Sequence, residues 1–174
     1  VSLENFGVST PTTELTKQVI DVTRPNVSFD QMTIDIYNSR VYLAGKHTWE
    51  PITINLREDV NNNVQKLTGD QLQKQFDFYE QSSAASGQDY KFTTRMEILD
   101  GGNGVNTPTV LETFELYGCY LESANYNTLA YATSEPVTVT LAVRYDNAVQ
   151  SPQGTGIGTA IGRTVNTLVT GGGA

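Results

Sequence analysis

The sequence predicts a mainly β protein, an antiparallel β-sandwich or small barrel of about six strands with one flanking α-helix. Several segments alternate between apolar and polar residues, which is the pattern of half-buried strands. Thr occurs 23 times and favours strands. Only one segment repeats its apolar residues at helical spacing, and no alternation of strands with helices is present that would indicate a parallel sheet.

The first half of the predicted sheet follows an extended N-terminal arm, residues 1–17, which is polar and shows no period. A strand is expected at 19–22 and ends before a proline, because proline supplies no amide proton to a ladder. Residues 31–37 alternate cleanly and predict a second strand. The stretch 38–57 then predicts a strand, a tight corner at Ala44–Gly45 and a further strand.

The one predicted helix spans residues 70–84. Leu72, Phe76 and Tyr79 fall at i, i+4 and i+7, which places them on one apolar stripe. Asp70 is the expected N-cap. We expect this helix to cover one end or one face of the sheet.

Three further segments complete the predicted sheet: 89–99, 109–122 and 136–145. The first and the last alternate cleanly. The middle one carries apolar and acidic residues on both faces, and Gly118 within it indicates a β-bulge.

The C-terminal residues 151–174 differ from the rest in being rich in Gly and Thr. Ile157, Ile161, Val165 and Leu168 recur there at helical spacing, although the Gly content disfavours a helix. We therefore expect a β domain over residues 18–150, flanked by the arms 1–17 and 151–174. Both arms are predicted to pack on neighbouring copies.

Composition excludes some classes of function. Charged residues make up 17% of the chain and the net charge is −8, which argues against a protein that binds nucleic acid by neutralising phosphate. Residues 70–122 hold nine acids and three bases, so the middle of the chain carries most of the negative charge. No apolar run reaches the length of a membrane span, so no membrane insertion is expected. Neither a signal-peptide pattern nor a second cysteine is present, which favours an intracellular protein.

Nothing in the sequence resembles a catalytic site. A single histidine, His47, and a single cysteine, Cys119, exclude multi-histidine metal sites and zinc sites built on several thiolates. A dyad of these two residues has no supporting signature. Glu58–Asp59 could bind a cation, but solvated charges on a polar loop are the simpler interpretation. We expect no enzyme activity and no cofactor.

One stretch points to a family. The order VYLAG at 41–45, then His47-Thr48-Trp49-Glu50, a strand at 52–56 and an acidic-Asn loop before the helix resembles the tail-tube proteins of contractile-tailed bacteriophages. The late strand Val137–Tyr145, followed by an aspartate, resembles the closing strand of that family. The similarity covers roughly residues 23–146. Type VI secretion tube proteins share this fold.

The resemblance implies a ring-forming tail-tube fold. Six copies would join their sheets into one continuous inner barrel, and these hexameric rings would stack into a tube inside a contractile sheath. Genomic DNA would pass through the lumen during ejection without specific binding. The implied partners are further copies, the sheath protein and the baseplate or tube-initiator proteins. The implied location is the virion tail, assembled in the host bacterial cytoplasm. The loops at 58–69 and 100–109 and the C-terminal arm depart from the family pattern.

Two groups of candidate residues follow from this interpretation. A lumen with surplus acids would repel phosphate and let DNA slide. The lumen-facing candidates on polar strand faces are Thr33, Asp35, Thr53, Asn55, Thr138 and Thr140. The hairpin 26–45 is the expected contact between rings, with Trp49 at its base. The ring-stacking candidates are Tyr37, Asn38, Val41, Leu43, Gly45, His47 and Trp49.

Other functions remain open at this point. A baseplate tube initiator or a secretion-system tube protein would have the same fold. A carbohydrate- or receptor-binding β-sandwich is the alternative of another class, because the chain has nine tyrosines and such sites need few polar residues.

Overall fold

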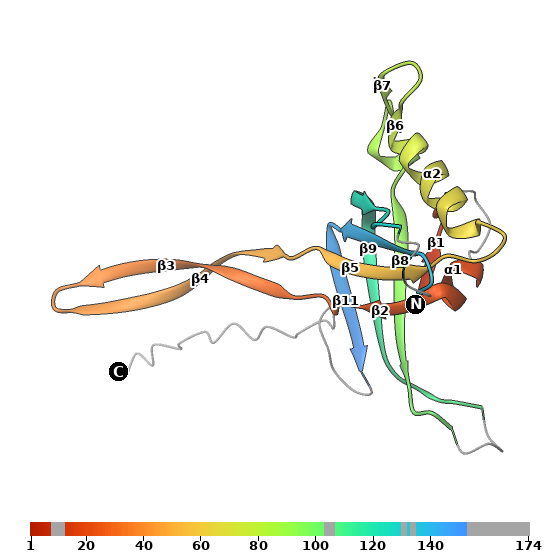
Figure 1. Ribbon diagram of the computed structural model, residues 1–174. Coiled ribbons are helices and arrows are strands. Elements are labelled where there is room, and N and C mark those ends of the chain that lie inside the picture. Colours follow the sequence, from red (N-terminus) through yellow and green to blue (C-terminus); the bar gives the residue numbers. More distant parts are fainter. Residues whose placement is uncertain (8–12, 103–106, 130–131, 133–134, 153–174) are drawn as a thin grey trace, which may run out of the picture.

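The protein is mainly β, as predicted, with one long helix (Figure 1). The computed structural model describes residues 1–7, 13–102, 107–129, 132 and 135–152. The strands are β1 (Ser2–Glu4), β2 (Val19–Val22), β3 (Val27–Ile36), β4 (Ser39–Trp49), β5 (Ile52–Arg57), β6 (Phe76–Asp77), β7 (Ser82–Ser83), β8 (Phe92–Leu99), β9 (Val110–Asn125), β10 (Thr138–Arg144) and β11 (Asn147–Pro152). The helices are α1 (Thr13–Gln18), α2 (Asn63–Gln75) and the short 3₁₀ turn η1 (Gly87–Asp89).

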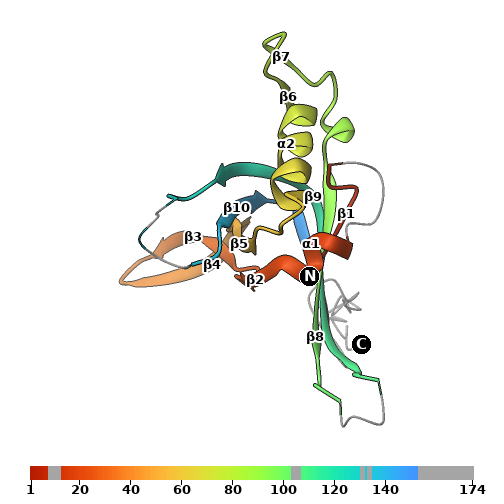
Figure 2. The same cartoon turned by 45° about the vertical axis from the view of Figure 1, so that its right-hand side comes forward.

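Strand β9 organises the sheet. The main sheet has the order β1-β8-β9-β10-β5-β2, with β11 also pairing with β9, and every pair is antiparallel. The first half of β9 lies between β8 and β11, and its second half pairs with β10. Figure 2 shows how this long strand connects the two parts of the sheet beneath α2.

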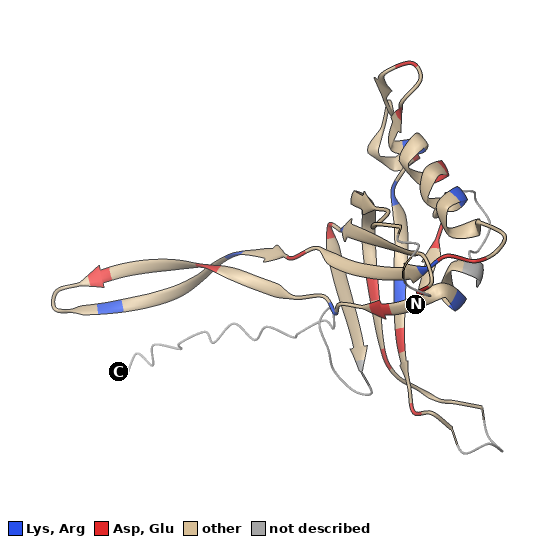
Figure 3. Cartoon of the chain, in the orientation of Figure 1, with Lys and Arg blue, Asp and Glu red and all other residues tan. Residues whose placement is uncertain are grey.

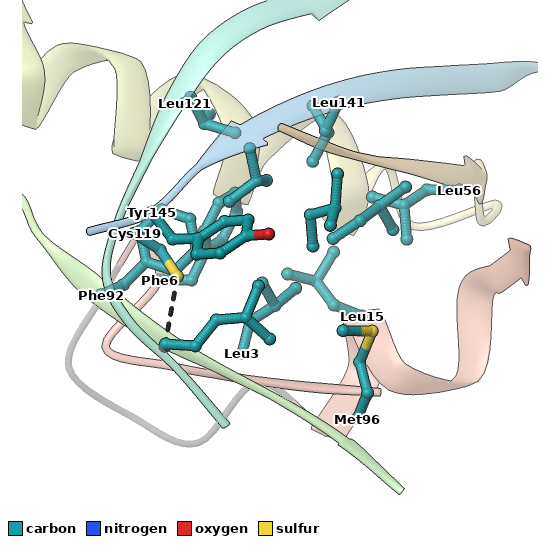
Figure 4. Packing of buried hydrophobic residues seen from close by; sticks show 14 of the residues in the cluster. Leu3, Phe6, Leu15, Leu56, Phe92, Met96, Cys119, Leu121, Leu141 and Tyr145 are labelled. Atoms are coloured by element: carbon teal, nitrogen blue, oxygen red, sulfur yellow. Dashed lines mark hydrogen bonds between the residues drawn. The ribbon is translucent and has the colours of Figure 1, made fainter. Parts of the chain in front are cut away.

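The core lies between the two parts of the sheet (Figure 4). Alternation is clean in β5 and β10, where every second residue is fully or almost fully buried and the residues between are more exposed. Cys119 is buried in β9, as predicted for a strand cysteine, and its thiol donates to the carbonyl of Leu116 at 3.3 Å. Burial raises the pKa of this thiol, which keeps it protonated.

The N-terminal residues correct one prediction. The sequence pattern predicts an extended arm over residues 1–17, but β1 pairs with β8 and Leu3 and Phe6 lie in the core. The rings of Phe6 and Phe92 pack edge to face, with their centroids 5.0 Å apart. The fully buried Gln71 of α2 accepts a hydrogen bond from the Gly7 amide at 3.0 Å. Leu3 and Phe6 are almost fully buried within the subunit itself, and this burial stabilises the placement of residues 1–7 against the core.

Helix α2 begins and ends earlier than predicted. It spans Asn63–Gln75, so it starts in the asparagine run, where the sequence pattern predicts a break, and ends before Phe76. The carboxylate of Asp77 accepts hydrogen bonds from the amides of Tyr79 and Glu80. This side-chain turn competes with helical hydrogen bonding and stops the helix. Tyr79 is consequently exposed rather than part of an apolar stripe.

The predicted corner at Ala44–Gly45 is also wrong. Strand β4 runs through both residues, and the turn lies at Tyr37–Asn38, where Tyr37 adopts a left-handed conformation. Gly45 sits instead opposite Asp30, where the register shifts. A Cβ at Gly45 would lie 2.9 Å from the Asp30 carbonyl oxygen, so glycine is needed there for close approach and not for a turn.

Gly118 confirms the predicted bulge and should tolerate no side chain. The register between β8 and β9 shifts at this point, and Gly118 has φ +68°. A Cβ there would overlap the carboxylate of Asp146. We expect Gly118→Ala to destabilise the fold by about 2–4 kcal/mol, from backbone strain and overpacking together. Urea unfolding monitored by the Trp fluorescence measures this.

The matched control is Gly69→Ala in α2. A Cβ at Gly69 meets nothing within 4 Å, so alanine should stabilise the helix by about 0.5–1 kcal/mol. A second variant combines Gly118→Ala with Asp146→Ala, which removes the clash. Asp146→Ala alone corrects for the lost ion pair with Lys91, so the difference between the two reports the backbone strain. Equal stability of Gly118→Ala and the parent protein would show that the bulge needs no glycine.

Candidate assembly surfaces

The β3–β4 hairpin projects far from the body of the protein (Figure 1). Every residue from Ser28 to Ala44 that lies on its two strands is exposed, including large apolar side chains. A two-stranded ribbon in water is marginally stable at best without a further strand or a covering element. The hairpin is therefore a surface that requires a partner.

The outer part of the hairpin has one apolar and one polar pleat face. Met32 lies opposite Leu43 and Ile34 opposite Val41, and Ile36 extends this apolar face to the tip. These five side chains remain 41–54% exposed. On the other pleat face, the Asp35 carboxylate accepts a hydrogen bond from Arg40 Nε at 2.8 Å. Figure 3 shows how few charges the hairpin carries.

An aromatic chain joins the hairpin to the core at its base. The ring centroids of Phe29 and His47 are 6.3 Å apart, those of His47 and Trp49 6.2 Å, and those of Trp49 and Tyr145 5.7 Å. Tyr145 is buried, and desolvation raises its pKa to about 12. An apolar groove lies beside this chain, lined by Val27, Phe29, His47, Trp49 and Asn147.

The structure gathers all of the predicted ring-stacking residues on this one hairpin. Tyr37 and Asn38 form its tip, Val41 and Leu43 lie on the apolar pleat face, and Gly45, His47 and Trp49 lie toward the base. The ring-stacking prediction omits four exposed apolar residues of β3: Phe29, Met32, Ile34 and Ile36. The alternation in 31–37 is the available signal, but it is equally typical of a core face.

Four of the predicted lumen residues form one polar face. On β5 and β10, Thr53, Asn55, Thr138 and Thr140 all point away from the core. Thr140 Oγ1 donates to Asn55 Oδ1 at 2.7 Å. Asn55 Nδ2 in turn donates to the Asp21 carboxylate of β2 at 2.7 Å. The hydrogen bonds thus run across three neighbouring strands.

Thr33 and Asp35 do not belong to this face, because both lie on the outer part of the hairpin. The charged residues that the strand registers place on the sheet's polar face are Asp21, Arg57, Glu122 and Arg144, and the last two lie 3.8 Å apart as an ion pair. Two acids and two bases make this face close to neutral. The expected surplus of acids is not found among the described residues of the face.

Neither end of this part of the sheet has a further strand beside it among the described residues. Among the described residues, β2 pairs only with β5, so its outer edge has no strand partner. At the other end, β9 continues past Cys119, the last residue that pairs with β8. There the Gln75 side chain accepts from the Leu121 amide at 2.8 Å and donates to its carbonyl at 3.0 Å. Gln75 therefore covers the edge of β9 at Leu121, whereas the edge of β9 that faces away from β10 beyond Leu121 and the outer edge of β2 lack a strand partner within the described residues. Strand edges without a partner are templates for pairing with another chain.

Charged pairs on the other part of the sheet fix local geometry. Glu115 accepts hydrogen bonds from the Tyr117 hydroxyl at 2.5 Å and from Arg95 at 2.6 Å, and both interactions lower the pKa of the Glu115 carboxyl. Lys91 pairs with Asp146 at 2.5 Å, which raises the pKa of the lysine. Glu115 and Tyr117 belong to β9 and Arg95 to β8, whereas Lys91 and Asp146 lie directly before β8 and β11.

The described residues contain no group of three or more His, Cys, Asp or Glu that could hold a metal ion. His47 and Cys119 lie in different surroundings: one flanks the hairpin groove, whereas the other is buried in β9. Within the same residues, no helix combines the length and the apolarity that a membrane span requires.

No family model and no curated protein matches the sequence. Solved structures do match. A chain of the anti-feeding prophage tube-terminating cap aligns with a TM-score of 0.60 and 10% identity over 87% of each chain. A chain of the PVC sheath–tube complex, from an extracellular contractile injection system in the extended state, aligns with a TM-score of 0.59 and 10% identity over 87% of each chain.

The chain has the fold of contractile injection tube proteins. A third structure agrees: a chain of the PVC sheath/tube terminator aligns with a TM-score of 0.58 and 10% identity, over 86% of this chain and 91% of the other. The resemblance drawn from residues 38–57 is thereby confirmed at the level of the fold. With identities near one in ten, these alignments identify the contractile tube fold and leave function to the surfaces described above.

Proposed function

We propose that this chain is a structural subunit of a tube in a contractile machine, and specifically of a bacteriophage tail tube. The uncovered β3–β4 hairpin carries this proposal, because its apolar residues have no partner within the described part of the subunit. The contractile tube fold supports the same conclusion. In this function the hairpin contacts the next ring, and a surrounding sheath contracts around the tube.

The open sheet edges support assembly into rings. In the proposed ring, β2 of one copy lies beside the end of β9 of the next copy, so that four strands per subunit continue into a closed inner barrel. Closure removes the exposed edges that a single subunit leaves. Six copies per ring is the number implied by the resemblance to tail-tube proteins.

The polar face of β5 and β10 is the proposed lumen. The Thr140 hydroxyl donates to Asn55 and the Asn55 amide donates to Asp21, so these two donors are already used and do not hold phosphate. A near-neutral surface of this kind lets DNA move without being trapped, because electrostatic attraction supplies most of non-specific DNA binding. Repulsion by surplus acids is not needed on this face.

A place at an end of the tube is the second candidate. Matching structures include a chain of the anti-feeding prophage baseplate, with a TM-score of 0.57 and 10% identity over 75% of this chain and 78% of the other, as well as the tube-terminating cap. A tube initiator would form single rings that stack only on other proteins, whereas a tube-body subunit would stack on itself.

Electron microscopy of the purified full chain tests the proposal. We expect rings or stacked tubes with a central hole at concentrations at which light scattering detects assembly. Isolated rings without stacking would favour the tube-end candidate. A strictly monomeric protein that binds glycans would contradict both and would support the carbohydrate-binding alternative.

A further inference from the structure

The apolar residues of the hairpin change pleat face part-way along β3. Near the base they occupy odd positions, Val27 and Phe29, whereas farther out they occupy even positions, Met32, Ile34 and Ile36. Successive side chains of a strand point to opposite faces, so the two sets belong to opposite pleat faces. The change coincides with the register shift that follows Phe29.

The twist of the β3–β4 ribbon brings the base set and the outer set of apolar residues to the same side of the hairpin. In Figure 1, β3 and β4 cross once between base and tip, so the same view shows opposite pleat faces in the two halves. Two-stranded ribbons twist strongly, and bulges increase the twist. The apolar residues change pleat face between base and tip, and the ribbon turns over between the same two halves. The two changes cancel, so the apolar residues form one continuous surface. We call it the hairpin strip: Val27, Phe29, Met32, Ile34, Ile36, Val41, Leu43, His47 and Trp49.

The strip has a defined lower end. It runs into the apolar groove at the base, whose wall includes Asn147, the first residue of β11. Trp49 Nε1 is buried there and has no hydrogen-bond partner within the described residues. Strand β11 then leads to Pro152, beyond which 22 residues lie outside the described part of the chain. The chain thus passes the groove shortly before its last segment begins.

We propose that residues 153–174 bind along the hairpin strip. This binding goes beyond the proposed tube function. It rests on that function in one respect, namely that the hairpin strip is covered when the subunits assemble. The occupant is the segment of the same copy, because β11 passes the groove and leads directly into it, and the hairpin with its bound segment then forms the contact between rings.

Reach supports this occupant. Extended chain spans about 3.3 Å per residue, so 22 residues cover about 70 Å. The ten residues of β3 extend over about 33 Å, and the six residues of β11 lead at most about 20 Å from the groove. The segment is therefore long enough to return to the groove and follow the strip to its tip.

Composition supports it as well. Arg163 is the one charged side chain among the 22 residues, so the segment lacks the charge that keeps a solvated tail in water. Ile157, Ile161, Val165 and Leu168 supply apolar side chains along its length. An extended segment can bury such side chains on an apolar strip, as peptides do when they bind to a sheet.

Disulfide cross-linking of the full chain tests the proposal. Val165→Cys in the segment, which is far enough from Pro152 to reach the outer strip, is combined with Ile34→Cys, and the matched control combines it with Thr33→Cys on the other pleat face. The native Cys119 stays in every variant because it is buried. Under mild oxidation we expect the cross-linked fraction of the Ile34→Cys pair to exceed that of the control pair at least about fivefold, which corresponds to about 1 kcal/mol.

Truncation after Pro152 gives a second measurement. An environment-sensitive dye on Ile34→Cys should report an apolar environment in the full chain and a watery one in the truncated chain. Equal cross-linking of both pairs, or dye signals that do not change on truncation, would overturn the proposal. If electron microscopy shows tubes while these tests fail, another copy's hairpin covers the strip and the tube function stands.

Discussion

Placing charges on the apolar pleat face of the hairpin should abolish assembly and spare the subunit fold. We expect Ile34→Asp combined with Val41→Lys to raise the concentration needed for assembly by at least about a hundredfold, or about 2.7 kcal/mol. The two residues lie directly opposite each other on β3 and β4, so the new charges attract and keep the ribbon paired. In the assembly both charges would be buried against apolar side chains, which is strongly unfavourable. Light scattering against protein concentration measures the threshold.

The matched control places the same charges on the other pleat face. Thr33→Asp with Tyr42→Lys changes the adjacent cross-strand pair, which is part of the polar side of the ribbon. Assembly of this variant should shift by less than about tenfold. Both variants should keep the thermal midpoint of the parent subunit, because surface substitutions change stability by about 0.5 kcal/mol or less. Unaltered assembly of the Ile34→Asp variant would remove the hairpin from the interface.

Much of the fold could be predicted from local patterns. Alternation located β5, β8 and β10, and the bulge at Gly118 followed from a single glycine inside a strand. The predictions failed where a local signal has two physical meanings. A glycine in a strand marks either a turn or a close backbone contact, and Gly45 is the second kind.

The assembly surfaces were harder to predict, because sequence alternation reveals an apolar face but not what covers it. Period alone cannot distinguish Ile34 from a core position such as Leu141, and only the structure shows that Ile34 is exposed whereas Leu141 is fully buried. The polar face depended on register: Thr140 meets Asn55 only because β10 pairs with β5, 85 residues away in the chain. Such long-range pairing leaves no local trace.

The charge of the proposed lumen depends on which charged residues lie on the polar sheet face, and not on the net charge of the whole chain. The chain carries a net charge of −8, yet the outward face of β5 and β10 and their neighbouring strands balances its acids and bases. A single added lysine per copy therefore gives this face a positive charge. Because every copy in the proposed ring would carry the substitution, one lysine per copy would form a continuous positive band around the proposed lumen.

Adding that band should stop DNA from passing. Thr53 and Ala142 lie opposite each other on β5 and β10 and both point away from the core, so Thr53→Lys and Ala142→Lys are two independent tests. We expect each variant to assemble normally and to lower DNA delivery by at least about tenfold at low salt. Raising the salt concentration should partly restore delivery, because counterion release governs binding to phosphate.

Asp35→Lys is the control, since it changes charge by more than either lysine variant but lies on the hairpin, away from the polar face. DNA delivery by this variant should match that of the parent if the sheet face, and not the hairpin, lines the lumen. The reverse result, with normal delivery through the Thr53→Lys and Ala142→Lys tubes and a block by Asp35→Lys, would move the lumen to the hairpin's polar face. Measuring all three variants at two salt concentrations separates a change in DNA retention from a loss of assembly, because only retention weakens as salt screens the added charge.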